Sequence, residues 1–240
     1  MQQNAFAENV AASKPVKLLN QRYRLVKKLG EGVYGIVYLA KDTKNGDKLV
    51  AIKRQISNDN IPKKEGYLKT AIREMSVLQE LGSGPSKHPN IVELVDIFQL
   101  KDGSPCIVIE FVEKGHLMEL LRGSATQTLL KPEHIKNLAY QMISGLQYLH
   151  SNFILHRDLK PDNMMLAADG TLKFIDFGMA RSYGSTIPFS QNQLTLVYRP
   201  PEIFFGATYY GPSADMWSIG CILAELLIKT PLFPGSRALD

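Results

Sequence analysis

Two short motifs in the second half of the sequence carry residue types suited to phosphoryl transfer. Residues 156–163 read HRDLKPDN, and the triplet DFG begins thirteen residues after Asn163, at Asp176. Asp158 can accept a hydrogen bond from an incoming hydroxyl group and orient it for in-line attack. Asn163 and Asp176 supply the oxygen ligands that Mg²⁺ prefers, and Lys160 can offset charge on the transferred group.

A glycine cluster near the amino terminus is suited to holding phosphates. Residues 30–37 read GEGVYGIV, and glycines let the backbone approach a phosphate and offer it N–H groups. The cluster alone also fits a chance turn or a dinucleotide fingerprint, but a fingerprint needs a helix after it. Here the next residues alternate like a strand and turn at Asn45-Gly46, which favours a β-hairpin flap over a nucleotide.

Lys53 ends the apolar run 50–52, where a buried ammonium group is costly unless it is paired. A lysine at a strand end more often extends into solvent. Glu74 is the candidate partner, because it lies near the edge of an apolar helical face and an ion pair would hold Lys53 toward the α- and β-phosphates. The apolar positions expected to form that buried face are Leu68, Ile72, Met75, Leu78 and Leu81.

The elements that must position these groups follow from the hydrophobic periodicity. Alternating runs between polar turns predict strands over 23–26, 36–39, 49–52, 91–98 and 106–112. Apolar residues every three or four positions predict helices over 67–81, 132–151 and 213–227. The middle helix is expected to bury one face, formed by Ile135, Leu138, Ala139, Met142, Ile143, Leu146 and Leu149.

The order of these elements predicts a bilobal α+β protein. A flexible tail is expected over 1–22, a small antiparallel β lobe with one helix over 23–112, and a mainly helical lobe over 113–240. A cleft at the boundary between the lobes is expected to hold the site.

The composition fits a soluble globular protein, with 45% hydrophobic and 21% charged residues and a net charge of +5. The basic residues form no long block, so the charge does not point to nucleic acid. Cys106 and Cys221 have no metal-site or disulfide spacing, which predicts reduced thiols in the cytosol or nucleus. The longest apolar stretch, 217–228, is interrupted by Glu225, is too short to span a bilayer and is expected to form a core helix.

The ordered set of motifs resembles the signature of protein kinases from about residue 23 to the end of the chain. The pair Lys160-Pro161 resembles Ser/Thr rather than Tyr kinases. Residues 70–74 (TAIRE), 195–202 (TLVYRPPE) and 215–221 (DMWSIGC) resemble cyclin-dependent kinases. This resemblance implies an ATP- and Mg²⁺-dependent Ser/Thr kinase.

The resemblance also assigns roles to individual residues. The implied catalytic residues are Asp158, Lys160, Lys53 and Glu74, and the implied metal ligands are Asn163 and Asp176. The implied ATP-binding residues are Leu29, Gly30, Glu31, Gly32, Val33, Tyr34, Gly35, Val37, Ala51, Lys53, Glu110, Val112 and Met165. Among these, Glu110 and Val112 would bind adenine through their backbones, while Val37, Ala51 and Met165 would sandwich it.

Regulation is implied by the same resemblance. Ser190 matches the position at which the family is activated by phosphorylation, and Arg73, Arg157 and Arg181 match its three phosphate-binding arginines. Tyr34 matches an inhibitory phosphorylation site.

Residues 153–155, 176–185 and 204–207 are most similar to the cyclin-dependent-kinase-activating kinase branch. That branch implies a cyclin H-like subunit and an assembly factor as partners, with other cyclin-dependent kinases and the RNA polymerase II C-terminal repeat as substrates. Arg199 matches a residue that accommodates proline after the phosphorylated site. The implied location is the nucleus, with the cytoplasm as a second compartment, and neither direct nucleic-acid binding nor membrane binding is expected.

Some positions depart from the family pattern. Val197 stands where the family usually has Trp, and His116 stands where it often has an Asp that faces ribose, in a stretch one residue longer than usual. His116 is expected to be a solvated polar residue. The family domain continues through further helices beyond residue 235, so the helix at 213–227 is expected to lack apolar cover. A truncated, non-catalytic module that binds cyclin or nucleotide is therefore the competing hypothesis.

Overall fold

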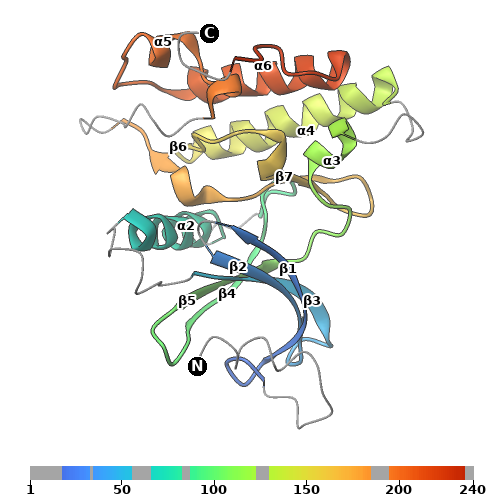
Figure 1. Ribbon diagram of the computed structural model, residues 1–240, viewed down its shortest axis with the longest axis vertical. Helices are drawn as coiled ribbons and strands as arrows, with labels where there is room; N and C mark the ends of the chain where they lie inside the picture. The colour runs from blue at the N-terminus through green and yellow to red at the C-terminus, as the bar shows by residue number, and fades with distance from the viewer. Residues whose placement is uncertain are drawn as a thin grey trace. The chain divides into compact units, whose positions relative to one another are not determined.

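The computed structural model describes these parts of the chain (Figure 1): residues 18–32, 35–55, 66–82, 87–122, 130–184 and 195–235. The chain divides into two compact units. The first comprises Met1–Met75 and Glu93–Phe111, and the second comprises Ser76–Val92 and Val112–Asp240. The segment Ser76–Val92 thus belongs to the second unit, although it precedes two strands of the first.

A five-stranded antiparallel sheet dominates the first unit, as the alternating sequence runs predicted. Its strand order is β1-β2-β3-β5-β4. The strands are β1 (Tyr23–Gly32), β2 (Gly35–Asp42), β3 (Lys48–Arg54), β4 (Leu94–Gln99) and β5 (Pro105–Glu110). β4 begins later than predicted and β5 ends earlier, at Glu110 rather than at residue 112.

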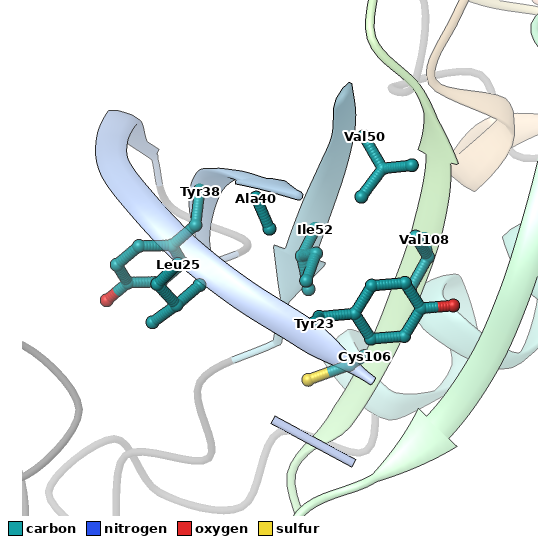
Figure 2. Packing of buried hydrophobic residues seen from close by; sticks show 8 residues of the cluster. All are labelled: Tyr23, Leu25, Tyr38, Ala40, Val50, Ile52, Cys106 and Val108. Atoms are coloured by element: carbon teal, nitrogen blue, oxygen red, sulfur yellow. The ribbon is translucent and has the colours of Figure 1, made fainter. Parts of the chain in front are cut away.

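One face of this sheet carries the apolar core of the unit (Figure 2). Tyr38 and Ile52 are cross-strand partners, and so are Ile52 and Val108, so their side chains share a face. The buried cluster comprises Tyr23, Leu25, Tyr38, Ala40, Val50, Ile52, Cys106 and Val108. Because side chains alternate along a strand, Ala51 and Lys53 lie on the opposite face.

Helix α2 (Gly66–Gly82) forms where the sequence predicts a helix, but its buried face differs from the prediction. Ile72 was expected to be buried and is 53% exposed, whereas Glu74 is only 5% exposed. Burial of Glu74 explains the difference, since on a helix of about 3.6 residues per turn Ile72 lies about 200° away from it. Over residues 70–82, where burial is described, the buried residues of α2 are Ala71, Glu74, Val77, Leu78 and Leu81.

The second unit is mainly helical, and its two long helices, α4 and α6, pack against each other (Figure 1). Besides the last seven residues of α2, its described helices are α3 (Leu117–Arg122), α4 (Pro132–Ser151), α5 (Pro201–Phe204) and α6 (Pro212–Ile228). Two small antiparallel ladders accompany them, β6 (Ile154–Leu155) with β9 (Arg181–Ser182), and β7 (Met164–Leu166) with β8 (Leu172–Phe174). The predicted bounds of α4 are confirmed, and those of α6 are correct to within one residue at each end.

Burial on these helices corrects two predictions. Ile143 of α4 is 46% exposed, because the buried side of that helix is formed instead by Leu138, Met142, Gly145, Leu146 and Leu149. Helix α6, expected to be a core helix, is not buried all round, since Trp217, Leu227 and Ile228 are exposed. Within the described ranges, no helix is both long enough and apolar enough to span a membrane.

Candidate active site

The ion pair predicted between Lys53 and Glu74 is present in the first unit. Lys53 Nζ donates to both carboxylate oxygens of Glu74, at 2.9 Å to Oε1 and 2.7 Å to Oε2. Both side chains are largely buried, with 18% of Lys53 and 7% of Glu74 exposed. A buried carboxylate that meets an ammonium group through both oxygens is a well-compensated charge, so the pair fixes the direction of the Lys53 side chain.

The face of the sheet that carries Lys53 also carries other predicted ATP-binding residues. Val37 of β2 is the cross-strand partner of Lys53, and Ala51 lies two residues before Lys53 on the same strand. Val37, Ala51 and Lys53 therefore form one continuous patch on the side away from the unit's core cluster.

The glycines of the β1–β2 hairpin serve different purposes. A Cβ atom at Gly35 would lie 2.1 Å from the carbonyl oxygen of Arg54, so the sheet itself requires glycine there. A Cβ atom at Gly30 or Gly32 would meet no described atom within 4 Å, so packing does not explain these two glycines. Val33 and Tyr34, which follow Gly32, lie outside the described residues.

Glu110, at the end of β5, has its backbone N–H bonded to the residue just before β4. That N–H donates to the carbonyl oxygen of Glu93 at 3.0 Å, and the Glu110 side chain accepts from the Glu93 N–H at 2.8 Å. An adenine contact through the Glu110 backbone would therefore use its carbonyl oxygen. Val112, the other predicted backbone contact, is buried, and Met165 lies in β7.

Asp158 is the centre of a polar network in the second unit. Its Oδ2 accepts from Lys160 Nζ at 2.8 Å and from Asn163 Nδ2 at 3.0 Å. Its Oδ1 accepts from the hydroxyl of Thr195 at 2.9 Å, and Lys160 Nζ also lies 3.3 Å from that hydroxyl. The structure thus brings together three residues that the sequence singled out and adds Thr195, which lies 37 positions from Asp158.

Asp215 of α6 holds the loop that carries Asp158. Its Oδ2 accepts from the backbone N–H of His156 and its Oδ1 from that of Arg157, both at 2.9 Å. His150 Nε2 lies 3.1 Å from the same Oδ2. Asp215 is 1% exposed, so these contacts compensate a fully buried carboxylate and fix the backbone immediately before Asp158.

Arg157 itself adopts a left-handed backbone conformation, with φ of +68°. Such a conformation is uncommon for a residue with a side chain and persists where the surroundings determine it. The next residue in the chain, Asp158, contacts Lys160 and Thr195.

Asn163 and Asp176 are brought near each other by the β7–β8 hairpin. Met164 pairs with Phe174, and the backbone N–H of Ile175 donates to the carbonyl oxygen of Asn163 at 3.0 Å. Asp176 follows directly, in a left-handed conformation with φ of +60°. Because Asn163 Nδ2 donates to Asp158, its amide oxygen points away from that carboxylate, and the donor set of one amide and one carboxylate oxygen fits Mg²⁺.

Two of the three predicted phosphate-binding arginines lie close in the second unit. Arg181 pairs with Leu155 across the β6–β9 ladder. Leu155 lies two residues before Arg157 in the chain. Arg157 is 2% exposed and donates from Nε to the hydroxyl of Tyr210 at 2.8 Å. The Nε of Arg181 is buried and has no hydrogen-bond partner among the described residues. Arg73 belongs to the first unit.

The segment after Thr195 is anchored on α6. The hydroxyl of Tyr198 donates to Glu225 Oε2 at 2.8 Å, and burial together with that carboxylate raises the pKa of Tyr198 well above its ordinary value. Ser218 Oγ donates to the carbonyl oxygen of Tyr198 at 2.9 Å. Arg199 lies over the ring of Phe204, with 5.4 Å between guanidinium carbon and ring centroid.

His116 is only partly solvated, because its Nδ1 lies 2.6 Å from the carbonyl oxygen of Asp162 and it forms an isolated bridge with Met165. Ser190 lies outside the described residues.

Sequence reasoning missed Thr195 and Asp215 as parts of the site. Asp215 carried a signal, because an acidic residue within an apolar helix requires a buried partner. Thr195 begins the segment 195–202 that resembles cyclin-dependent kinases, but nothing in that segment indicates Asp158 as its partner.

Comparisons with known proteins agree with this geometry. The family model described as protein kinase domain matches residues 23–240. Cyclin-dependent kinase 7 of Xenopus laevis is 43% identical over 221 residues, which cover 92% of this chain and 60% of that protein. Serine/threonine-protein kinase crk1 of Schizosaccharomyces pombe is 41% identical over 214 residues, covering 89% of this chain and 60% of that protein.

A solved structure is similar over almost the whole chain. It is the CAK complex of Chaetomium thermophilum bound to ATP-gamma-S, one chain of which is 35% identical with a TM-score of 0.81. The similarity covers 99% of this chain and 68% of that one. The chain spans about 60% of the length of the two curated relatives named above.

Proposed function

The chain belongs to the protein kinase family, and we propose that it transfers the γ-phosphoryl group of ATP to Ser and Thr hydroxyls of protein substrates. The observation that carries the proposal is the network around Asp158. A carboxylate held by an ammonium group, an amide and a hydroxyl has a fixed orientation, which is what positioning of a nucleophile requires.

The hydrogen bonds distinguish the two oxygens of Asp158. Among the residues that the structure describes, Oδ2 accepts from both Lys160 and Asn163, whereas Oδ1 accepts from Thr195 alone. Since each carboxylate oxygen has room for about two hydrogen bonds, Oδ1 is the atom that would accept the substrate hydroxyl. Lys160, which contacts Asp158 and Thr195, would stabilise negative charge that develops on the transferred group.

Four further observations support nucleotide binding. Lys53, fixed by Glu74, would bind the α- and β-phosphates, and Gly30 and Gly32, which packing does not explain, would let the hairpin backbone approach them. Asn163 and Asp176 would hold Mg²⁺, which when bound neutralises charge on the phosphates. The ATP-gamma-S in the similar solved structure supports ATP as the nucleotide.

A cyclin subunit is the proposed partner. The similarity to cyclin-dependent kinase 7 supports this, and so does Ile72, an apolar residue of α2 that is 53% exposed. An assembly factor and a cyclin H-like subunit extend the proposal, with cyclin-dependent kinases and the RNA polymerase II C-terminal repeat as substrates. The nucleus is the proposed location, with the cytoplasm as a second compartment.

Regulation by phosphorylation is also proposed. Arg157 and Arg181, brought close by the β6–β9 ladder, would bind a phosphate on Ser190, with Arg73 as the third arginine. The buried Nε of Arg181 without a described partner supports an anion at this place. Phosphorylation of Tyr34 in the glycine loop is proposed to inhibit.

The test is a kinase assay of the protein with a cyclin subunit, radiolabelled ATP and a peptide that contains Ser-Pro. Replacement of Asp158 by Asn should lower kcat by roughly 10²–10⁴-fold and leave ATP binding intact. The matched control is Asp162→Asn in the same loop, where the side chain is exposed and kcat should change little.

The outcome separates the enzyme from the competing binding module. A wild-type protein that binds ATP and cyclin but transfers no label, or an Asp158→Asn variant as active as the Asp162→Asn control, would overturn the proposal.

A further inference from the structure

The loop that precedes α6 contacts the catalytic segment at a point that the proposed mechanism does not use. Tyr210 lies in this loop, two residues before α6 begins at Pro212. Its hydroxyl accepts a hydrogen bond of 2.8 Å from Nε of Arg157. Arg157 directly precedes Asp158, so this contact acts on the residue next to the proposed nucleophile-orienting carboxylate.

Tyr210 contacts Arg157 in two ways. Besides the hydrogen bond through its hydroxyl, the guanidinium carbon of Arg157 lies over the Tyr210 ring, 5.5 Å from the ring centroid. The ring also packs against the small buried cluster of Ile203 and Ala214. Removal of the oxygen alone would therefore delete the hydrogen bond and keep the contacts of the ring.

Arg157 is held at both ends by residues five positions apart. Asp215 accepts from its backbone N–H at 2.9 Å, and Tyr210 accepts from its side chain at 2.8 Å. A third contact runs from Nη1 of Arg157 to the carbonyl oxygen of Met179, at 3.3 Å. These contacts surround a guanidinium group that is almost fully removed from water and a backbone with φ of +68°.

The buried charge of Arg157 requires hydrogen-bond acceptors, and the Tyr210 hydroxyl supplies one. A buried guanidinium group that lacks acceptors is strongly destabilised, and a neutral hydroxyl compensates it without adding a second charge. Burial raises the pKa of Tyr210 above its ordinary value, while Arg157 and Arg181 oppose that rise, so Tyr210 stays a neutral acceptor at physiological pH.

We propose that Tyr210 is a positioning residue for the reaction: its hydroxyl holds the Arg157 guanidinium group and thereby fixes the turn that presents Asp158. This inference deepens the proposed function and rests on it for the catalytic consequence. The structural consequence, an ordered backbone at residues 156–158, does not depend on the protein being a kinase.

The test compares Tyr210→Phe with Tyr209→Phe, which removes the same atom from the neighbouring tyrosine, 63% exposed. Amide hydrogen exchange over residues 156–158 should be about tenfold faster in Tyr210→Phe than in the control, a modest value for loss of a hydrogen bond to a charged group. The kcat should fall about tenfold with the KM for ATP unchanged within about twofold, because Asp158 acts on the hydroxyl substrate.

A double-mutant cycle with Arg157→Lys separates positioning from mere packing. Lysine keeps the positive charge but has no Nε–H to donate side-on, so Tyr210→Phe should produce no further increase in exchange in that background. Two results would overturn the inference. One is an exchange rate in Tyr210→Phe equal to that of the Tyr209→Phe control. The other is an increase in exchange on Tyr210→Phe that is as large in the Arg157→Lys background as in the wild type. If the exchange results hold and the wild-type protein transfers no phosphate, the proposed function fails and the structural role of Tyr210 stands.

Discussion

Replacement of Asp215 by Asn should release the backbone that precedes Asp158. The two oxygens of Asp215 accept from two different N–H groups, those of His156 and Arg157, each at 2.9 Å. An asparagine has one oxygen and one NH₂ group, so it can accept from one of these donors and must turn its own donor toward the other.

The cost follows from this mismatch. One hydrogen bond to a charged acceptor is lost, at about 1.5–3 kcal/mol, and one buried N–H group is left without an acceptor, at about 1–3 kcal/mol. Because Asp215 is 1% exposed, water does not readily replace the missing partner. We expect a total of about 3–5 kcal/mol in the free energy of local opening, with the removal of one buried negative charge as a partial offset.

Amide hydrogen exchange measured by mass spectrometry reports this quantity directly. A loss of about 3 kcal/mol corresponds to roughly 10²-fold faster exchange of the His156 and Arg157 amides. The control is Asp162→Asn, which removes a charge from an exposed side chain in the same loop. If exchange in Asp215→Asn stays within threefold of that control, Asp215 does not hold the loop and the reasoning is refuted.

Three further substitutions test other contacts. Thr195→Val removes the hydroxyl that donates to Asp158 at 2.9 Å, and kcat in a steady-state assay should fall about tenfold. Gly35→Ala places a Cβ atom 2.1 Å from a carbonyl oxygen of β3 and should lower the free energy of unfolding in urea by about 1–3 kcal/mol, whereas Gly30→Ala should change it by less than about 1 kcal/mol. Asp42→Asn should cost about 2–3 kcal/mol, because a fully buried carboxylate loses its bidentate arginine partner. The same arginine holds the pKa of Asp42 below its ordinary value of 3.8, so this stability is complete above that pH and is lost as the pH falls through the lower folded-state pKa.

Each of these has a matched control. Thr195→Ser keeps the hydroxyl and should retain most of the activity; equal losses in the Val and Ser variants would refute a role for the hydrogen bond to Asp158. Asp47→Asn removes a carboxylate from an exposed ion pair with Arg24 and should cost less than about 1 kcal/mol. An acid-induced loss of stability as large in Asp42→Asn as in the wild type would show that Asp42 is not its source. For the glycines, equal unfolding energies of the two alanine variants would contradict the packing argument.

Local sequence was sufficient for the secondary structure and for much of the chemistry. Alternation predicted the five strands, and helical spacing predicted α2, α4 and α6. The strands and helices are determined locally, because the pleat of a strand and the turn of a helix set which residues share a face. Residue type also indicated Glu74 as the candidate partner of Lys53, and the two side chains form an ion pair.

The same local rules did not decide which helical face is buried. The spacing around Ile72 and around Ile143 fits an apolar stripe, yet both residues are exposed. In α2 the buried ion pair between Glu74 and Lys53 sets the rotation of the helix. Lys53 lies 21 positions earlier in the sequence, so this contact is a tertiary one. Periodicity narrows the choice to a few rotations, and tertiary contacts select one of them.

The contacts that complete the candidate site depend wholly on tertiary structure. Thr195 meets Asp158 across 37 positions, Asp215 meets Arg157 across 58, and Tyr210 meets it across 53. The sequence around a hydroxyl or a carboxylate group does not indicate which distant donor or acceptor that group will contact. The sequence by itself determined which groups were available for chemistry; the fold decided which of them touch, because hydrogen bonds require atoms within about 3 Å and only the packed chain brings them that close.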